Sequence, residues 1–205
     1  MARQALEGLD VDRNALASVF ASSDGDLDLI DRLCTDIYGD RVPVSPTVFH
    51  NSVHNAVAGY WSIAEGCRGG STSLAAWDGS LAAGLLEAAT QIACSGQPVL
   101  LVAYDLPATG VLAAHRPFAG TFGCALVLAA ASGGRVAPLA TLGLALIESG
   151  AEDRLPPDLD PALERLRAGN PAARALPVLR LVACGSAGNL RLPYLHDLSL
   201  AVSVR

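Results

Sequence analysis

Uninterrupted apolar runs dominate the middle of the chain. Residues 98–104 (PVLLVAY), 122–130 (FGCALVLAA) and 139–148 (LATLGLALIE) lack the alternation of a strand with one exposed face. Such runs are typical of strands covered on both faces, so they predict helices packed on a mixed or parallel sheet. Residues 15–22 (ALASVFAS), closed by a Ser-Ser-Asp-Gly turn, predict another buried strand, and residues 71–75 predict a short one.

Apolar residues at spacings of three and four predict three helices. The first spans residues 27–37, with Asp26 and Asp28 near its start, where negative charge suits the helix dipole. The second opens with Ser45 as N-cap and Pro46 at its first position, and its wide apolar face predicts one continuous helix to about Gly66. The third is a helix of small residues over 80–94.

The last quarter of the chain has a different pattern. Residues 150–177 are rich in Pro, Ala and charge, which predicts a surface excursion with one short helix around 161–167. Three segments with partial alternation follow: VLRLVAC (178–184), NLRLPYL (189–195) and LSLAVSV (198–204). They predict an antiparallel β meander at a sheet edge, and the whole pattern indicates an α/β fold.

Length and charge narrow the function classes. A chain of 205 residues with 51% hydrophobic content fits one domain, residues 1–205, and no apolar stretch is long enough for a membrane span. The start of the chain lacks a secretory signal, so we expect a cytoplasmic protein. The net charge is −6 and every basic residue is Arg, which excludes lysine chemistry and makes nucleic acid a poor partner.

Several candidate sites have a simpler structural interpretation. The five cysteines are widely spaced and form no C-x-x-C pair, so we expect buried free thiols rather than a zinc or disulfide framework. His50 and His54 have a metal-binding spacing but no evident third ligand, and we predict no metal and no cofactor. Asp78 is either a helix cap, which we favour, or a buried general acid or base. His115 and His196 lack the partners of a hydrolase triad.

One ordered pattern runs through residues 45–130. A helix that carries Asn55, Ala58, Gly59, Ser62 and Ile63 is followed by Gly66 and Gly69, by residues 71–76, and by Asp78 and Ser80 at the start of the next helix. Residues 115–118 (HRPF) then precede 120–130 (GTFGCALVLAA). This order resembles the amino-terminal half of a β-ketoacyl synthase. In that family an N-x-x-A-G-x-x-S/T-I helix, a G-x-x-G-P turn, a T-A-C-A-S segment and an R-P-F-D element follow one another.

The resemblance implies a thiolase-like half: a mixed five-stranded sheet with helices on its faces, here with a small β meander at the carboxyl end. Residues 1–9 resemble the helix after the family's first strand. Aligning the long helix places Asp78 where a working ketosynthase has its cysteine, and the family's two histidines come from a second half of the fold. The resemblance therefore implies a chain without catalysis of its own.

Relatives of this kind resemble the chain-length-factor subunits of type II polyketide and aryl polyene pathways. The implied partner is a full-length β-ketoacyl synthase in a heterodimer, or a second copy in a homodimer, with acyl carrier protein reached through the partner. Residues at the implied interface or acyl tunnel are His50, Asn51, His54, Asn55, Tyr60, Trp61, Ser71, Thr72 and Ser73. Two alternatives stay open: a stand-alone acyltransferase or thioesterase that uses Asp78 with His50 or His54, and a homo-oligomeric structural protein.

Overall fold

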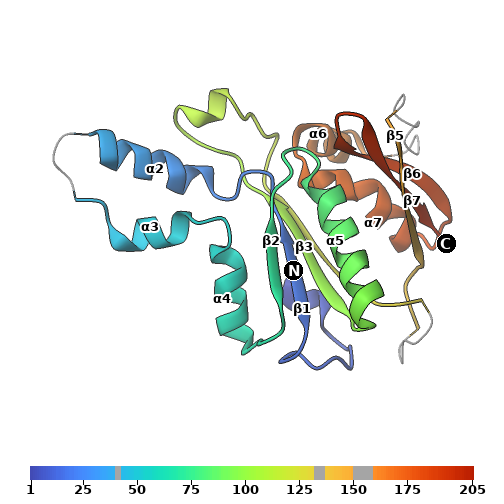
Figure 1. Ribbon diagram of the computed structural model, residues 1–205. Coiled ribbons are helices and arrows are strands. Elements are labelled where there is room, and N and C mark those ends of the chain that lie inside the picture. The colour runs from blue at the N-terminus through green and yellow to red at the C-terminus, as the bar shows by residue number, and fades with distance from the viewer. Residues whose placement is uncertain (40–42, 132–136, 150–158) are drawn as a thin grey trace.

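The fold is built on a four-stranded mixed sheet, seen edge-on in Figure 1. The computed structural model describes residues 1–39, 43–131, 137–149 and 159–205. The strands of this sheet, in the spatial order β2-β1-β3-β4, are β1 (Ala17–Ala21), β2 (Ser71–Leu74), β3 (Val99–Asp105) and β4 (Phe122–Leu128). β1 is parallel to both of its neighbours, and β4 is antiparallel to β3. The predicted fifth strand is wrong for the described residues, in which this sheet has four strands.

Coverage of the apolar runs depends on their place in the sheet. Every residue of β3 is buried, as a run with no polar position predicts for a central strand. β4 is only partly buried because it lies at the edge, next to β3 alone among the described strands. The prediction of strands covered on both faces is thus confirmed for β3 and wrong for β4 and β5 (Leu142–Glu148), whose residues are half-buried or exposed except for Cys124.

A second sheet is formed by the end of the chain. β5, β6 (Gly188–Leu195) and β7 (Leu198–Val204) pair antiparallel in the order β5-β7-β6. The predicted meander is therefore confirmed for β6 and β7, although they form a separate sheet with β5. The predicted strand over 178–184 is wrong: α7 (Leu176–Ala183) is a helix with Pro at its start. Its apolar residues Val178 and Leu181 stand three apart and both reach the core, which is helical spacing.

Helix α5 (Ser80–Ser95) lies between the two sheets and joins them into one core. Leu81 and Leu85 belong to the same buried cluster as Leu101 of β3 and Val202 of β7. A Cβ on Gly84 would lie 2.9 Å from the Cβ of Ala21 and 3.0 Å from Cδ1 of Leu101, so glycine allows α5 to approach β1 and β3 closely.

The segment before β6 also enters this core. Helix α6 (Pro161–Gly169) confirms the predicted short helix and contains no buried residue. The next turn, η2 (Ala172–Ala175), buries Ala172, Ala173 and Ala175, and Pro177 is fully buried too. The prediction of a surface excursion to residue 177 is thus wrong beyond α6. These small side chains pack against the sheet although the segment looks like a loop in sequence.

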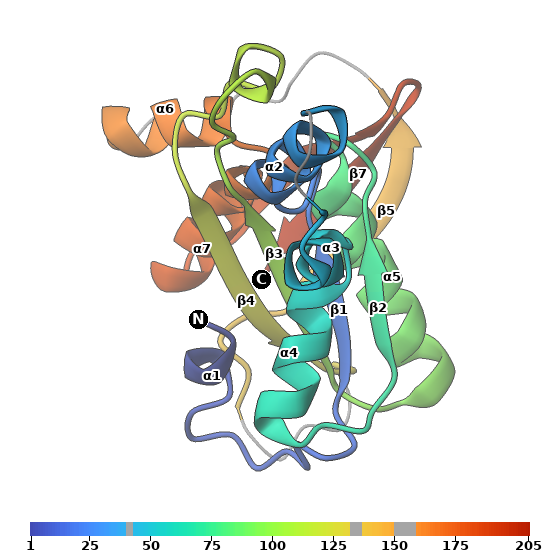
Figure 2. The same ribbon diagram turned by 90° about the vertical axis from the view of Figure 1, so that its left-hand side faces the viewer.

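The opposite face of the four-stranded sheet is covered by α4 (Ala56–Glu65) and by the short α1 (Ala2–Ala5) (Figure 2). Helices α2 (Leu27–Tyr38) and α3 (Pro46–Ser52) project from the body as an arm (Figure 1). The single helix predicted from Ser45 to Gly66 is wrong, because Val53 is extended and separates α3 from α4. No helix among the described residues is long and apolar enough to cross a membrane.

Candidate functional site

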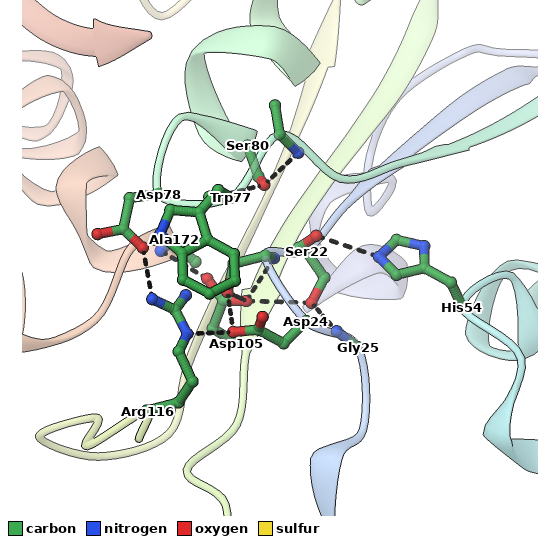
Figure 3. A network of polar contacts seen from close by, with 12 residues as sticks. Ser22, Asp24, Gly25, His54, Trp77, Asp78, Ser80, Asp105, Arg116 and Ala172 are labelled. Atoms are coloured by element: carbon green, nitrogen blue, oxygen red, sulfur yellow. Dashed lines mark hydrogen bonds and ion pairs between the residues drawn. The ribbon is translucent and has the colours of Figure 1, made fainter. Parts of the chain in front are cut away.

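The polar residues of greatest interest gather where β1, β2 and β3 end. Ser22 and Ser23 follow β1, Trp77 and Asp78 follow β2, and Asp105 is the last residue of β3 (Figure 3). In open α/β sheets ligands bind at the carboxyl ends of parallel strands. This edge is therefore the candidate site.

Asp105 is buried and ties three segments together. Its Oδ1 accepts hydrogen bonds from the Oγ of Ser22 at 3.0 Å and from the N and Oγ of Ser23, each at 2.7 Å. Its Oδ2 accepts from the backbone N of Ala172 at 2.9 Å, and Asn170 Nδ2 donates to the Asp105 carbonyl oxygen. Burial raises the pKa of Asp105, although the four hydrogen bonds oppose that shift. The Asp105 carboxylate therefore accepts hydrogen bonds from the segment after β1 and from η2, and it holds both segments against β3.

The turn between β2 and α5 carries backbone strain. Trp77 has a φ of 50°, and no other non-glycine residue in the described part of the chain has a positive φ. Ser80 fixes the turn, since its Oγ accepts from the N of Ala76 at 2.9 Å and donates to the carbonyl oxygen of Trp77 at 2.6 Å. A strained strand-to-helix turn is how many enzymes present a nucleophile. Here the strain falls on Trp77, one residue before Asp78.

Asp78 does not cap the helix, so the interpretation that we favoured from sequence is wrong. The N-cap of α5 is Gly79, and no side chain caps it. The Asp78 carboxylate instead accepts hydrogen bonds from Nη1 of Arg116 at 2.9 Å and from Nη2 of Arg174 at 3.3 Å. Arg174 also donates to the Asp78 carbonyl oxygen, so two guanidinium groups hold this residue.

Arg116 is the centre of a cluster of charges and rings. Its Nε donates to Oδ2 of Asp24 at 2.8 Å, and its guanidinium lies 3.9 Å from the ring centre of Trp77 and 4.9 Å from that of Phe118. Burial by itself would lower the pKa of Arg116, but the hydrogen bonds to Asp24 and Asp78 outweigh it and the pKa is raised. Arg116 and Phe118 belong to the HRPF element noted in the sequence. That element therefore clamps the strand-to-helix turn.

The candidate residues on α3 and α4 fall into two groups. His50 and Tyr60 meet edge to face with ring centres 6.1 Å apart, and the Tyr60 hydroxyl donates to Oδ1 of Asn51 at 2.6 Å. This group lies on the exposed side of the helices. His54 instead turns back to the body, where its Nε2 lies 3.1 Å from the carbonyl oxygen of Ser22. The two histidines thus have separate partners, because the break between α3 and α4 turns them apart.

The remaining candidates lie on α4 and β2. Asn55, the residue immediately before α4, is exposed. Trp61 packs on the core between α4 and the sheet. On β2, Ser71 accepts a hydrogen bond from Ser18 at 3.0 Å, and Thr72 contacts Gln91 of α5 at 3.1 Å. Ser73 is half-buried beside β1. These residues line one edge of the sheet and do not join the cluster around Arg116.

Sequence reasoning missed Asp24, Asp105, Asn170 and Arg174 as site residues. Asp105 offered one signal, because it ends a buried apolar run at the carboxyl edge of a predicted strand.

The prediction of buried thiols is mostly wrong: Cys34, Cys94 and Cys184 are exposed, Cys67 is half-buried and Cys124 is buried, all of them free. Burial raises the pKa of Cys124 to about 12.

Comparison with known proteins now decides the family. The model of the β-ketoacyl synthase N-terminal domain matches residues 1–156. The chain belongs to the β-ketoacyl synthase N-terminal domain family. A similar chain occurs in the solved structure of the ketosynthase ApeO in complex with its chain length factor ApeC from Xenorhabdus doucetiae. The match covers 92% of this chain and 69% of that chain at 22% identity and a TM-score of 0.64, so it shows a shared fold. No curated protein matches significantly.

This family membership confirms the ketosynthase-like half fold predicted from residues 45–130. The resemblance described above implies that the nucleophile of this family lies in the turn after β2. The chain has Trp77 and Asp78 there, and neither side chain forms a thioester. The thiols of Cys67 and Cys124 are engaged elsewhere, with the carbonyl oxygen of Leu16 and in the core respectively. The arrangement is suited to holding the turn rigid.

Proposed function

We propose that this chain is a non-catalytic, chain-length-factor-like subunit that pairs with a complete β-ketoacyl synthase in fatty acid or polyketide biosynthesis of the aryl polyene type. One observation carries the proposal: the strained turn after β2 holds Trp77 and Asp78, with Arg116 stacked on one and paired with the other. A thiolate nucleophile at such a turn needs a free cysteine at the helix start. This turn offers none.

A stand-alone acyltransferase has less support. It would need the Asp78 carboxylate to work with His50 or His54. The hydrogen bonds of Asp78 go to Arg116 and Arg174, whereas His54 contacts the backbone of Ser22. The Asp78 carboxylate is therefore engaged with two guanidinium groups and not with either histidine.

The proposed interface with the ketosynthase is the edge of β2 together with the outer face of α3 and α4. β2 is the end strand of its sheet, and its outer edge is unpaired among the described residues. Exposed apolar side chains lie on both helices and at the break between them: Phe49 on α3, Val53 at the break, and Val57, Tyr60 and Ile63 on α4. A free strand edge beside an apolar stripe is typical of a surface that another chain covers. The similar chain belongs to a complex of a ketosynthase with its chain length factor, which supports this choice of partner.

Association with a ketosynthase is the first test. We would mix the chain with the complete β-ketoacyl synthase encoded nearest to its gene and measure mass by size-exclusion chromatography with light scattering. We expect a 1:1 complex, which Ile63→Arg weakens because it puts a charge on a side chain that is 79% exposed in the apolar stripe. The matched control is Leu195→Arg, at an exposed leucine (53%) of the second sheet. A monomer with no affinity for the ketosynthase contradicts the proposal, and a homodimer alone favours the structural alternative.

Acylation is the second test. The purified chain, incubated with an acyl-carrier-protein thioester or with the cysteine-directed inhibitor cerulenin, should gain no adduct at residues 76–80 by peptide mass spectrometry. The ketosynthase in the same mixture is the positive control. A stoichiometric acyl group on Asp78 or a neighbouring residue would refute a non-catalytic subunit.

A further inference from the structure

We propose that Glu87 of α5 makes the open edge of β2 reject a second copy of this chain and accept a partner strand that brings an arginine or lysine beside it. The inference deepens the proposed function, because it concerns the same strand edge and states which chemistry a partner needs there. Its grounds are the backbone geometry of that edge and the charge that lies over it, both of which belong to this chain alone.

The outward-facing backbone groups of β2 belong to Ser71 and Ser73. On the inner side, N–H groups of the β1 segment donate to the carbonyl oxygens of Gly70 at 2.9 Å and Leu74 at 3.2 Å. Because the backbone groups of successive strand residues point to opposite sides, Thr72 shares this inner side and its two neighbours face outward. Their N–H and C=O groups have no strand partner within the part of the chain that the structure describes, since β2 is the end strand.

A second copy would pair with this edge antiparallel, about a two-fold axis. Using all four outward groups joins Ser71 of each chain to Ser73 of the other and places Thr72 directly opposite its own copy. Directly opposite residues have their side chains on the same face of the sheet, with Cβ atoms about 4.5 to 5.5 Å apart. Thr72 points toward α5, where its hydroxyl contacts Glu87 and Gln91. The two copies of this threonine would therefore meet on the α5 face.

Glu87 puts a negative charge at that meeting point. Its Oε1 lies 3.4 Å from the Thr72 hydroxyl and accepts a hydrogen bond from Nε2 of Gln91 at 2.8 Å. Both donors are neutral. The ion pairs between described residues do not include Glu87. Its charge is therefore not balanced by a cation of the described chain and is available to a partner.

The other charges that flank β2 do not offset this one. Asp78, beyond the strand, is already paired with Arg116 and Arg174. Arg68 precedes the strand and stands four residues from Thr72, a length that spans about 13 Å in an extended chain. Two copies would thus bring two carboxylates together, and like charges across a strand pair oppose association. A partner with an arginine or lysine at this place converts the same charge into an attraction.

The experiment uses the chain as its own partner by reversing the charge. We would measure self-association by analytical ultracentrifugation, and the melting temperature, for the parent chain, Glu87→Arg and their equimolar mixture. Each chain alone should stay monomeric because like charges meet, whereas the mixture should form a 1:1 dimer at least about tenfold more tightly than either chain alone. The matched control is Glu148→Arg, at an exposed glutamate that ends β5, and its mixture with the parent should stay monomeric.

Two further variants test the place and the charge separately. Ser73→Pro, added to Glu87→Arg, removes an outward N–H without touching the bonds to β1, so its mixture with the parent should not dimerise. Glu87→Gln keeps an oxygen that accepts from Gln91 and removes only the charge. We expect it to self-associate about tenfold more tightly than the parent at an unchanged melting temperature. This neutral variant gives the answer if Glu87→Arg does not fold.

Every outcome supports or overturns the role of Glu87. A monomeric mixture of folded chains overturns it, and so does a parent chain that dimerises by itself. Equal dimerisation with Glu148→Arg, or in the presence of Ser73→Pro, also overturns it, because the charge would then act elsewhere. The ketosynthase takes no part in these measurements. A parent chain that binds the ketosynthase beside a monomeric mixture leaves the proposed function standing without this role, and a dimeric mixture beside a parent chain that binds no ketosynthase does the reverse.

Discussion

Helices α4 and α5 cover opposite faces of the same sheet and are both rich in small apolar residues, yet they are buried to very different degrees. α5 buries Ser80, Leu81, Ala82, Gly84, Leu85 and Ala88, whereas α4 buries Ala58 alone. The difference arises because α5 is covered twice, by the four-stranded sheet and by the second sheet with α7, while α4 is covered only by the first sheet. An apolar helix face therefore does not by itself indicate a core. On α4 it leaves an exposed apolar surface, which is part of the surface that we propose a partner covers.

The largest expected effect comes from the buried side of this comparison. Leu85→Ala should lower the free energy of unfolding by about 3 to 5 kcal/mol, because it removes a fully buried side chain between two sheets that cannot both collapse onto the cavity. Leu85 is 2% exposed. Urea denaturation followed by circular dichroism measures the loss. Ile63→Ala on α4 is the control and should change stability by less than about 0.5 kcal/mol. Equal losses for the two variants would remove the contrast between the helices.

A second prediction concerns the side of α4 that faces the sheet. Trp61 is half-buried against the cluster of Phe20 and Leu100, so Trp61→Ala should cost about 2 to 3 kcal/mol of unfolding free energy, less than a fully buried tryptophan. Chemical denaturation measures it. Trp61→Phe keeps an aromatic ring on the same contacts and should recover most of the loss. No loss in Trp61→Ala would mean that α4 is held by something other than this packing.

The elements that were predicted correctly carry strong local signals. α2 begins after Asp26, whose side chain caps the helix by accepting a hydrogen bond from the N of Leu29, and it ends at Gly39. α5 ends at Gly96 in a left-handed conformation, as a C-terminal glycine allows. α7 was misassigned because its run of apolar residues is also compatible with a strand, and its packing against β6 and β7 is not visible in the sequence. The break at Val53 was missed because His54 makes a contact distant in sequence, with Ser22.

The candidate site was predictable only in part. The HRPF element and the turn at Asp78 were noticed as sequence features, and the structure brings them together through Arg116. Asp24 and Arg174 join them from positions 54 residues before and 96 residues after Asp78, a pairing that no local pattern encodes. Strain at Trp77 was equally invisible, since tryptophan is not a residue type that indicates positive φ.

A third prediction tests the polar link that holds η2 on the α5 side of the sheet. Asp105→Asn should lower the free energy of unfolding by about 1 to 2 kcal/mol, because the amide nitrogen would face the N–H of Ala172 and leave that buried donor unpaired. Thermal and urea denaturation at pH 7 measure the loss. Asp105→Ala removes the acceptor of all four of these hydrogen bonds, so it should lower the free energy of unfolding further.

The same variant has a defined pH dependence. Burial raises the folded-state pKa of Asp105 above the unfolded value of 3.8. The folded protein therefore binds this proton more tightly, and the stability from Asp105 is greatest below about pH 4 and is lost as the pH rises through the folded pKa. The difference in unfolding free energy between the parent chain and Asp105→Asn should accordingly shrink from pH 4 to pH 7. Growth of that difference with pH would mean that the four hydrogen bonds outweigh burial.

The smallest expected effect on stability comes from the exposed side of α4. Tyr60 is 52% exposed, and its hydroxyl bonds to Asn51 on the same surface, so Tyr60→Ala should change the unfolding free energy by less than about 0.5 kcal/mol. Association should respond much more, since an aromatic residue at the centre of an interface contributes about 2 kcal/mol or more. Tyr60→Phe separates the ring from the hydroxyl and should keep most of the affinity. Trp61 is the next residue along the helix, and consecutive helical residues diverge by about 100°, so its ring faces the sheet instead.

Light scattering of mixtures with the ketosynthase would show whether Tyr60→Ala weakens the complex while leaving the monomer's melting curve in place. If it lowers stability and leaves association untouched, then α4 is an ordinary covering helix, and the contrast with α5 has no bearing on a partner.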